Sequence, residues 1–455
     1  MHGMKRVRLL TIVLLLPLMA AGCAGESVPP SSAEEASSAQ TLDTSTSSGA
    51  EATSLMTEEI SSTGAESTRR SDPSVTAART MEPTSRPTTA PVSTSSVSTA
   101  TTAKTPPEGF LTQALFAAGR DAYGSKSINI LGDSISHGAN APNIPEDSYV
   151  GLLKKAVAQK FGAHNYGFTS LLCTFSNPSG LYQELHTIDT QGAWSIVEGT
   201  DAGDHLGFRY YRSAAGNGTA DMTFTVERGS QEVGRYVRGV YVYYEAGPHQ
   251  GSFRVEVNGK QLATVDCRQE KRDPCARSSY IPLPTDLKGR AKIRLIKEPG
   301  DSITITGMGY AEDPNGVTVQ NYSRSGLQLV EVSDEVIQSV CRANVLILAL
   351  GFNDAGMQAD HVAFRNKIDK VIQGCEAAGT KLVVVDTLWT FAEKKEFYRA
   401  QLQRAADELD GLYITFTDLV EKNPTMIQDT AHPTVEGHKL VATRICERLG
   451  LPAPK

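Results

Sequence analysis

Apolar residues follow two periods along this chain, and each period indicates a type of secondary structure. Short, nearly continuous apolar runs are typical of strands buried on both faces. Four such runs occur, at residues 127–131, 345–350, 382–385 and 412–416. Apolar residues recur at helical spacing in six further stretches, residues 110–118, 148–161, 327–340, 362–376, 397–409 and 434–449. Strands that alternate with helices in this way predict an α/β domain with a mostly parallel sheet.

The period changes to two in the middle of the chain, between residues 164 and 316. Apolar and polar residues alternate most clearly in two groups: Met222, Phe224 and Val226, and Phe253, Val255 and Val257. Asn258-Gly259 follows the second group and is typical of a two-residue hairpin turn. We therefore predict an inserted all-β sandwich, which divides the α/β domain into residues 108–163 and 317–455.

The N-terminal part has the pattern of an export signal. Residues 1–22 begin with basic residues, continue with an apolar run too short to span a membrane, and end in Ala20-Ala21-Gly22 before Cys23. Small residues before a cysteine resemble a bacterial lipobox, which implies that Cys23 carries a lipid. An ordinary signal peptide with an incidental cysteine is the alternative. We expect an exported protein, lipid-anchored to the cell membrane or outer membrane and facing the periplasm or the exterior.

Composition and charge narrow the choice of function. Residues 23–107 are mainly Ser, Thr, Ala, Glu and Pro and cannot bury a core, which predicts a disordered linker. The net charge is −7, and removal of the signal, with Lys5, Arg6 and Arg8, lowers it to about −10 (−7 minus 3). Such an acidic chain argues against nucleic-acid binding. No metal-ligand spacing such as His-Glu-x-x-His occurs, so we expect no catalytic metal.

Seven cysteines in an exported chain predict disulfide bonds. Cys267 and Cys275 flank a short polar segment, and we predict a bond between them. A second bond can form between two of three cysteines that we place near one end of the sheet: Cys341, Cys375 and Cys446. The sequence leaves open which two, and also whether Cys173 is a free thiol.

Four stretches carry side chains that together support nucleophilic catalysis. Gly132-Asp133-Ser134 ends the strand at residues 127–131 and places a hydroxyl at its carboxyl end, where open α/β sheets bind ligands. Asp429 and His432 lie in one loop and supply a base and the acceptor that orients it. Asn353 follows the strand at residues 345–350, and Gly326 offers a backbone N–H without a side chain. With the N–H of Ser134, these two donors predict an oxyanion hole.

These four blocks, in this order, resemble those of the SGNH (GDSL-like) hydrolase family. The resemblance covers residues 127–161 and 317–451. It implies a flavodoxin-like three-layer fold and an ester-hydrolysing or acyl-transferring activity without a cofactor. Ser134 and Gly326 are 192 positions apart (326 minus 134), whereas a few dozen separate these blocks in the simplest members. The intervening segment resembles, in architecture and position, the jelly-roll carbohydrate-binding modules inserted in some SGNH peptidoglycan O-acetylesterases.

The expected function is that of a cell-envelope serine esterase that removes O-acetyl groups from peptidoglycan or another polysaccharide. An O-acetyltransferase or a lipase with the same catalytic residues, and a polysaccharide-binding lipoprotein without activity, are the alternatives. Six aromatic residues of the insertion are candidates for stacking on sugar rings, although we expect most to pack in the core: Trp194, Tyr210, Tyr211, Tyr241, Tyr243 and Tyr244.

Overall fold

The computed structural model describes residues 109–116, 126–162, 165–170, 186–198, 203–227, 237–284, 290–390 and 395–454. All of them belong to one compact unit, Ser95–Lys455. The predicted signal and linker, Cys23 and Cys173 lie outside these residues. None of the helices in the described ranges is long and apolar enough to cross a membrane.

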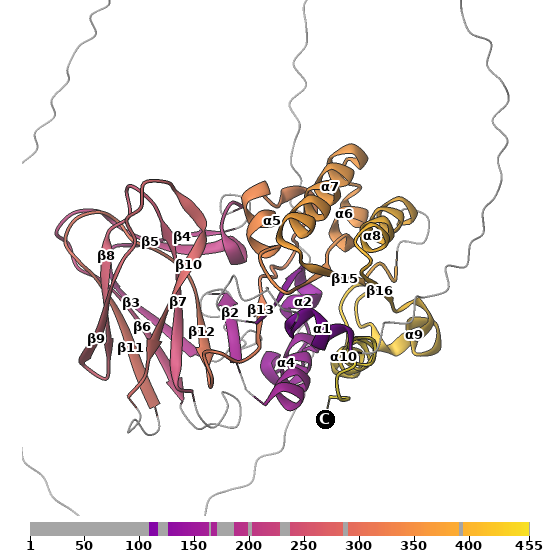
Figure 1. Ribbon diagram of the computed structural model, residues 1–455, viewed down its shortest axis with the longest axis horizontal. Helices are drawn as coiled ribbons and strands as arrows, with labels where there is room; N and C mark the ends of the chain where they lie inside the picture. The colour runs from indigo at the N-terminus through magenta and orange to yellow at the C-terminus, as the bar shows by residue number, and fades with distance from the viewer. Residues whose placement is uncertain are drawn as a thin grey trace, which may run out of the picture. The chain divides into compact units, whose positions relative to one another are not determined.

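A parallel sheet forms the centre of the α/β part (Figure 1). Its strands are β1 (Ser127–Gly132), β13 (Thr318–Asn321), β14 (Val345–Ala349), β15 (Lys381–Asp386) and β16 (Leu412–Thr415). They lie in the order β13-β1-β14-β15-β16, and all neighbours are parallel. The first strand thus lies between the second and the third, which is the flavodoxin-like order. Ligands bind at the carboxyl end of β1 in such sheets, because the chain connections diverge there.

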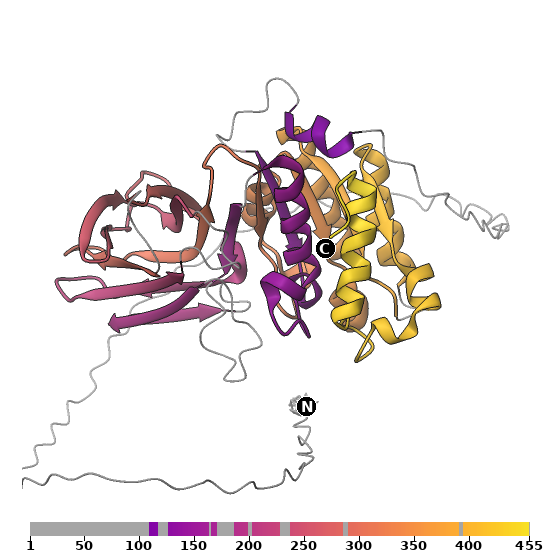
Figure 2. The same cartoon turned by 90° about the horizontal axis from the view of Figure 1, so that it is seen from below.

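Helices cover both faces of this sheet, and each face has its own apolar core. One face packs against α1 (Phe110–Phe116), α4 (Tyr149–Phe161) and α10 (Val435–Leu449). Figure 2 shows α4, in purple, beside α10, in yellow. The other face packs against α5 (Asp334–Val340), α7 (His361–Ala378) and α8 (Glu396–Glu408). Along β14, Ile347 belongs to the first core and Leu346 and Leu348 to the second, as the two-residue period of a doubly covered strand requires.

The sheet continues beyond β13 into the predicted insertion. Strand β2 (Asn165–Ser170) pairs in parallel with β13 and antiparallel with β12 (Thr304–Ala311). From β12 the sheet extends through β7 (Gly239–Ala246) to β10 (Asp273–Pro282), with β5 (Arg209–Ser213) and β4 (Trp194–Glu198) at its side. Within the described residues this sheet has 11 strands. The α/β part and the β-rich part therefore share one hydrogen-bonded sheet (Figure 1).

A second sheet, fully antiparallel, completes the β-rich part. Its order is β3 (His186–Gly192), β6 (Ala220–Glu227), β11 (Arg290–Lys297), β8 (Ser252–Val257) and β9 (Lys260–Asp266). The predicted inward residues Met222, Phe224, Phe253 and Val255 are buried, in a core shared with residues of β7 and β12. Asn258 and Gly259 join β8 to β9 with φ of 49° and 82°. Two positive φ angles are what a type I′ hairpin turn requires, so the predicted turn is confirmed.

The predicted helix at residues 327–340 is wrong in its first half. A 3₁₀ turn, η5 (Leu329–Glu331), comes first, and helix α5 begins only after Ser333, whose hydroxyl accepts the Val336 N–H. The sequence pattern also missed several short helical segments: α2 (Ser134–His137), α3 (Ile144–Asp147), η4 (Leu206–Phe208), α6 (Phe352–Met357), α9 (Thr417–Lys422) and η6 (Pro424–Met426). The Asp354 carboxylate accepts the N–H groups of Leu329 and Val330, and this contact fixes η5 outside a regular helix.

The cysteines differ from the predicted arrangement. Cys267 is a buried free thiol in the structure, in contrast to the predicted Cys267–Cys275 bond, and the side chain of Cys275 lies outside the described residues. Cys341 and Cys375 are also buried free thiols, with their sulfur atoms 3.6 Å apart. Cys446 is buried and free as well.

Most of the candidate aromatic residues pack in the core, as expected. Tyr210, Tyr211, Tyr243 and Tyr244 are at most 6% exposed. Trp194 and Tyr241 are half-buried and lie against the apolar cores of the two parts. The aromatic residues of these strands therefore serve mainly to hold the β-rich part together.

Candidate active site

Ser134 lies where β1 turns into the short helix α2. The Asp133 carboxylate accepts the N–H of Ile135 at 3.0 Å and caps this helix, so the chain turns sharply and leaves Ser134 at the strand's end. Gly132 allows the turn, because a Cβ at this position would collide with the side chain of Ser136. The location at the carboxyl end of β1 is the one predicted from the sequence.

His432 and Asp429 reach Ser134 from the loop before α10. The Ser134 hydroxyl lies 2.8 Å from His432 Nε2, and His432 Nδ1 lies 2.8 Å from Asp429 Oδ2. Asp429 Oδ1 also accepts the backbone N–H of His432 at 2.8 Å, which closes a tight turn around the carboxylate. The Trp389 indole N–H donates to the carbonyl of Ala431 at 3.1 Å and ties the loop to the segment after β15. The structure thus brings the three residues into one hydrogen-bonded chain.

The charge of Asp429 suits the role of orienting the histidine. Desolvation tends to raise the pKa of Asp429, but hydrogen bonds from the His432 ring and backbone outweigh it and hold the pKa below its usual value. The carboxylate is therefore ionised at neutral pH and accepts a hydrogen bond from Nδ1–H of His432. That contact leaves Nε2 unprotonated and facing Ser134, as a general base requires.

Gly326 lies in a turn that follows β13, in a segment that runs beside the end of β1. The Tyr322 N–H donates to the Ile130 carbonyl, and the Arg324 N–H donates to the Gly132 carbonyl, so this segment runs beside the end of β1. A hydrogen bond from the Leu327 N–H to the Arg324 carbonyl closes the turn. Gly326 has a φ of +75°, which favours glycine at this position of the turn.

Asn353 connects the turn to the nucleophile loop. It lies in the first turn of α6, directly after β14, and its side-chain amide donates to the Leu327 carbonyl at 3.1 Å. The same nitrogen lies 3.5 Å from the Asp133 carboxylate, which is a long contact. Asn353 therefore contacts the segments of both other proposed donors, and its role as an oxyanion donor stays a prediction.

Two buried carboxyl groups, Asp133 and Asp354, lie behind this arrangement. Desolvation raises the pKa of Asp133 to about 7, against the hydrogen bond from Ile135, and the negative charge of Asp354 adds to the rise. Desolvation also raises the pKa of Asp354 to about 6, opposed by the N–H groups of Leu329 and Val330. Both side chains hold loops in place through these N–H groups, and no sequence pattern indicated that their pKa values are shifted.

The two histidines near this site have structural positions. His438 is fully buried in α10, and its Nε2 donates to the Ala139 carbonyl at 2.9 Å while Nδ1 accepts the Tyr149 N–H. Burial lowers the pKa of His438, so it is neutral and joins α10 to the start of α4. His137 is buried in α2.

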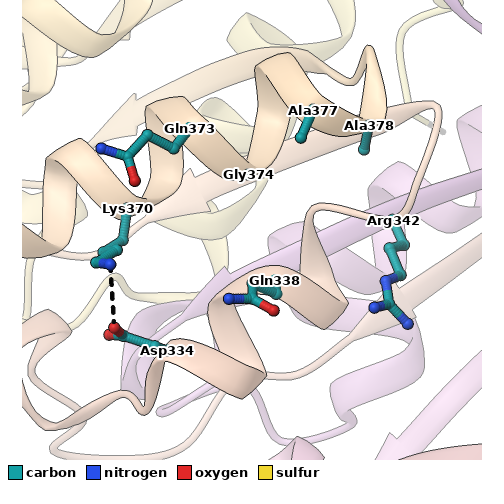
Figure 3. Close-up of a pocket in the computed structure, with 8 residues that line it drawn as sticks. All are labelled: Asp334, Gln338, Arg342, Lys370, Gln373, Gly374, Ala377 and Ala378. Carbon is teal, nitrogen blue, oxygen red and sulfur yellow. Dashed lines mark ion pairs between the residues drawn. The ribbon is translucent and has the colours of Figure 1, made fainter.

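In the described part of the chain, no group of three or more His, Cys, Asp or Glu side chains could hold a metal ion. A surface pocket between α5 and α7 is lined by Arg342, Gln373 and an ion pair of Lys370 with Asp334, whose atoms are 3.5 Å apart (Figure 3). It includes none of the proposed catalytic residues.

Comparison with known proteins supports the fold. No family model matches the sequence, and no curated protein sequence is detectably similar. A solved structure of a peptidoglycan O-acetylesterase is similar over 73% of this chain and 92% of its own, with a TM-score of 0.52 and 15% identity. A family two carbohydrate esterase from Clostridium thermocellum, in complex with cellohexaose, covers 53% of this chain and 95% of its own at 14% identity, but its TM-score of 0.24 is too low to support a conclusion.

The fold and the hydrogen-bonded Ser134, His432 and Asp429 define an α/β protein with a site of the serine-hydrolase type. The chain shares the fold of the peptidoglycan O-acetylesterase. This agrees with the resemblance of its four sequence blocks to the SGNH hydrolase family.

Proposed function

We propose that this chain is a serine esterase of the cell envelope that removes O-acetyl groups from peptidoglycan or another polysaccharide. The observation that carries the proposal is the chain of hydrogen bonds from Ser134 through His432 to Asp429, with distances of 2.8 Å at both steps. Such an arrangement raises the nucleophilicity of a hydroxyl at neutral pH.

The reaction proceeds through an acyl-enzyme. His432 Nε2 takes the proton of Ser134 as the hydroxyl oxygen attacks the ester carbonyl. The tetrahedral intermediate collapses, and His432 gives the proton to the departing sugar oxygen. Water then attacks the acetyl group on Ser134 with His432 again as the base, which releases acetate and restores the hydroxyl.

Three donors are available for the negative charge that develops on the carbonyl oxygen: the N–H groups of Ser134 and Gly326 and the side-chain amide of Asn353. The contact of the Asn353 amide with the Asp133 carboxylate is 3.5 Å long and therefore weak. The same N–H can leave this carboxylate and donate to the oxyanion at little cost. Fixed donors of this kind stabilise the transition state more than the substrate.

Two features support a polysaccharide as the substrate. The solved structure that shares the fold is described as a peptidoglycan O-acetylesterase. The predicted export signal and lipid at Cys23 would also place the enzyme at the cell envelope, where acetylated glycans occur. We propose that the β-rich part, as a jelly-roll-like module, binds the glycan chain.

The test compares three substrates with the purified protein and its Ser134→Ala variant. Acetate release is measured from O-acetylated peptidoglycan, from acetylated xylan and from an emulsified long-chain lipid ester, with and without an added sugar acceptor. Acetate release from a glycan that requires Ser134 supports the proposal. Preference for the lipid ester would indicate a lipase, acetyl transfer to the acceptor would indicate a transferase, and no turnover of any substrate would contradict esterase activity.

A further inference from the structure

The turn η4 (Leu206–Phe208) of the β-rich part has an unfavourable backbone conformation. Gly207 and Phe208 have φ of +76° and +55°. A positive φ is uncommon and strained for a bulky residue, so it persists only where the surroundings fix it. Phe208 is only 1% exposed, which shows that its ring is enclosed despite the position in a loop.

Charged residues hold the base of this turn within the β-rich part. The two ring nitrogens of the buried His205 lie 2.6 Å from Asp204 and 3.0 Å from Glu245. Arg272 binds the same two carboxylates at 2.8 Å and 2.7 Å. Desolvation tends to raise the pKa of Glu245, but the bonds from His205 and Arg272 lower it to about 2. The His205 ring also packs against Tyr210, with 4.1 Å between the ring centroids.

The tip of the turn packs against the segment that carries Gly326. Leu206 and Phe208 share an apolar core with residues on both sides of Gly326: Tyr322, Leu327, Leu329 and Val332. The Arg324 guanidinium lies over the Phe208 ring, 5.6 Å from its centroid, and binds Glu331 at 2.7 Å. Behind the turn, the Gly203 carbonyl accepts the Ser333 N–H at 3.4 Å. The β-rich part thus contacts residues 322–333 at several points.

Gly326 itself is exposed, and a Cβ added to it would meet no atom within 4 Å. The position of its N–H therefore depends on the turn around it, which the hydrogen bond from the Leu327 N–H to the Arg324 carbonyl closes. Arg324 lies on Phe208, and Leu327 lies in the core that Phe208 and Leu206 enter.

We propose that Phe208 is a positioning residue for catalysis: the η4 turn of the β-rich part holds the Gly326 turn in the place where its N–H meets the oxyanion. This inference rests on the proposed esterase function. It assigns to the β-rich part a role in the chemical step, in addition to any binding of glycan.

The test compares Phe208→Ala with Phe253→Ala in the otherwise intact protein. Phe253 is a matched control, because it is also a fully buried phenylalanine of the β-rich part, but it packs in the core between the two sheets. Phe208→Leu and Phe253→Leu form a milder pair if the alanine variants fail to fold. Two quantities are measured: kcat and KM for a small aryl acetate, and hydrogen exchange of the peptide that spans residues 322–333.

We expect Phe208→Ala to lower kcat roughly tenfold to hundredfold, with KM changed less than about twofold, because the variant displaces an oxyanion donor without removing it, and complete loss of a donor costs about a hundredfold or more. Hydrogen exchange across residues 322–333 should accelerate in this variant only, while Phe253→Ala keeps kcat within about twofold of the unchanged protein. Equal kcat in the two folded variants, or unchanged exchange in residues 322–333 of Phe208→Ala, would overturn the proposal. Hydrogen exchange needs no turnover, so it still decides whether η4 holds the Gly326 turn if the protein hydrolyses no ester.

Discussion

The buried carboxyl of Asp133 makes a specific prediction about stability and pH. Asp133 is 0% exposed, and its pKa rises from 3.8 to about 7 because burial disfavours the charged form. A raised pKa means that the folded protein binds the proton more tightly than the unfolded chain does. The contribution of Asp133 to the free energy of unfolding is therefore fully present below about pH 4 and is lost as the pH rises toward about 7.

The size of the effect follows from the shift. A change of about three pKa units, from 3.8 to about 7, corresponds to about 4 kcal/mol across this window. Asp133→Asn removes the titration and keeps an oxygen that accepts the Ile135 N–H. We expect the unfolding free energy of the variant to fall less steeply than that of the unchanged protein between pH 4 and pH 7, by up to about 4 kcal/mol over the whole window.

The assay is urea unfolding of both proteins at pH 4, 5, 6, 7 and 8. Asp354, whose pKa is raised to about 6, titrates in the same window and remains in both proteins, so only the difference between the two curves is attributed to Asp133. Asp334→Asn is a control in which the stability should change with pH in the opposite direction, because the hydrogen bond from Lys367 lowers the pKa of Asp334. Its removal should destabilise the protein at neutral pH and have less effect as the pH falls. Parallel curves for Asp133→Asn and the unchanged protein would refute the reasoning.

The remaining predictions concern the catalytic residues and the thiols. Ser134→Ala and His432→Ala should each lower turnover of a small aryl acetate by about a thousandfold or more, while the circular dichroism spectrum stays unchanged. Near-normal turnover by a folded Ser134→Ala variant would exclude Ser134 as the nucleophile. Asn353→Ala should lower kcat about a hundredfold or more, which steady-state kinetics will show, because one proposed oxyanion donor is lost. Cys341 and Cys375, with sulfur atoms 3.6 Å apart, should form a disulfide when the chain folds in an oxidising compartment containing a disulfide oxidant. Non-reducing peptide mapping detects that bond, and two free thiols in protein made there would contradict it.

The catalytic residues could be predicted from the sequence because each lies in a short, characteristic stretch. Ser134 ends an apolar strand, and Asp429 and His432 are three residues apart in one loop. That these two stretches meet was implied by the resemblance of the four blocks to the SGNH family, since 298 positions separate Ser134 from His432. Residues 327–340 show where local patterns fail. Their pattern is helical, but Leu329 and Val330 donate to Asp354, which lies 24 or more positions further along the chain. A side chain that distant competes with helix formation in a way that periodicity does not reveal.

The sequence pattern also did not indicate which strands of the β-rich part pair with one another. Residues 165–170 give no indication that β2 pairs with β13 on one side and with β12 on the other. The sequence predicted an inserted β segment, but a strand's neighbours depend on contacts between distant residues. The buried free thiol of Cys267 has a similar cause, since spacing along the chain does not determine where the Cys267 side chain points.

The position of β2 limits how this protein can be divided by engineering. A linker that replaced residues 164–316 would remove β2 and leave one edge of β13 with unpaired N–H and C=O groups. An exposed strand edge of this kind can pair with another chain and so promotes aggregation. The β-rich part, cut out alone, would have the corresponding defect along β12. The shared strand therefore makes the two parts a single cooperative unit, in which heating should produce one calorimetric transition and not two. To exchange the β-rich part between relatives, β2 and β13 would need to be transferred together with it. The pairing of β2 with β13 and the pairing of β2 with β12 would then both stay intact.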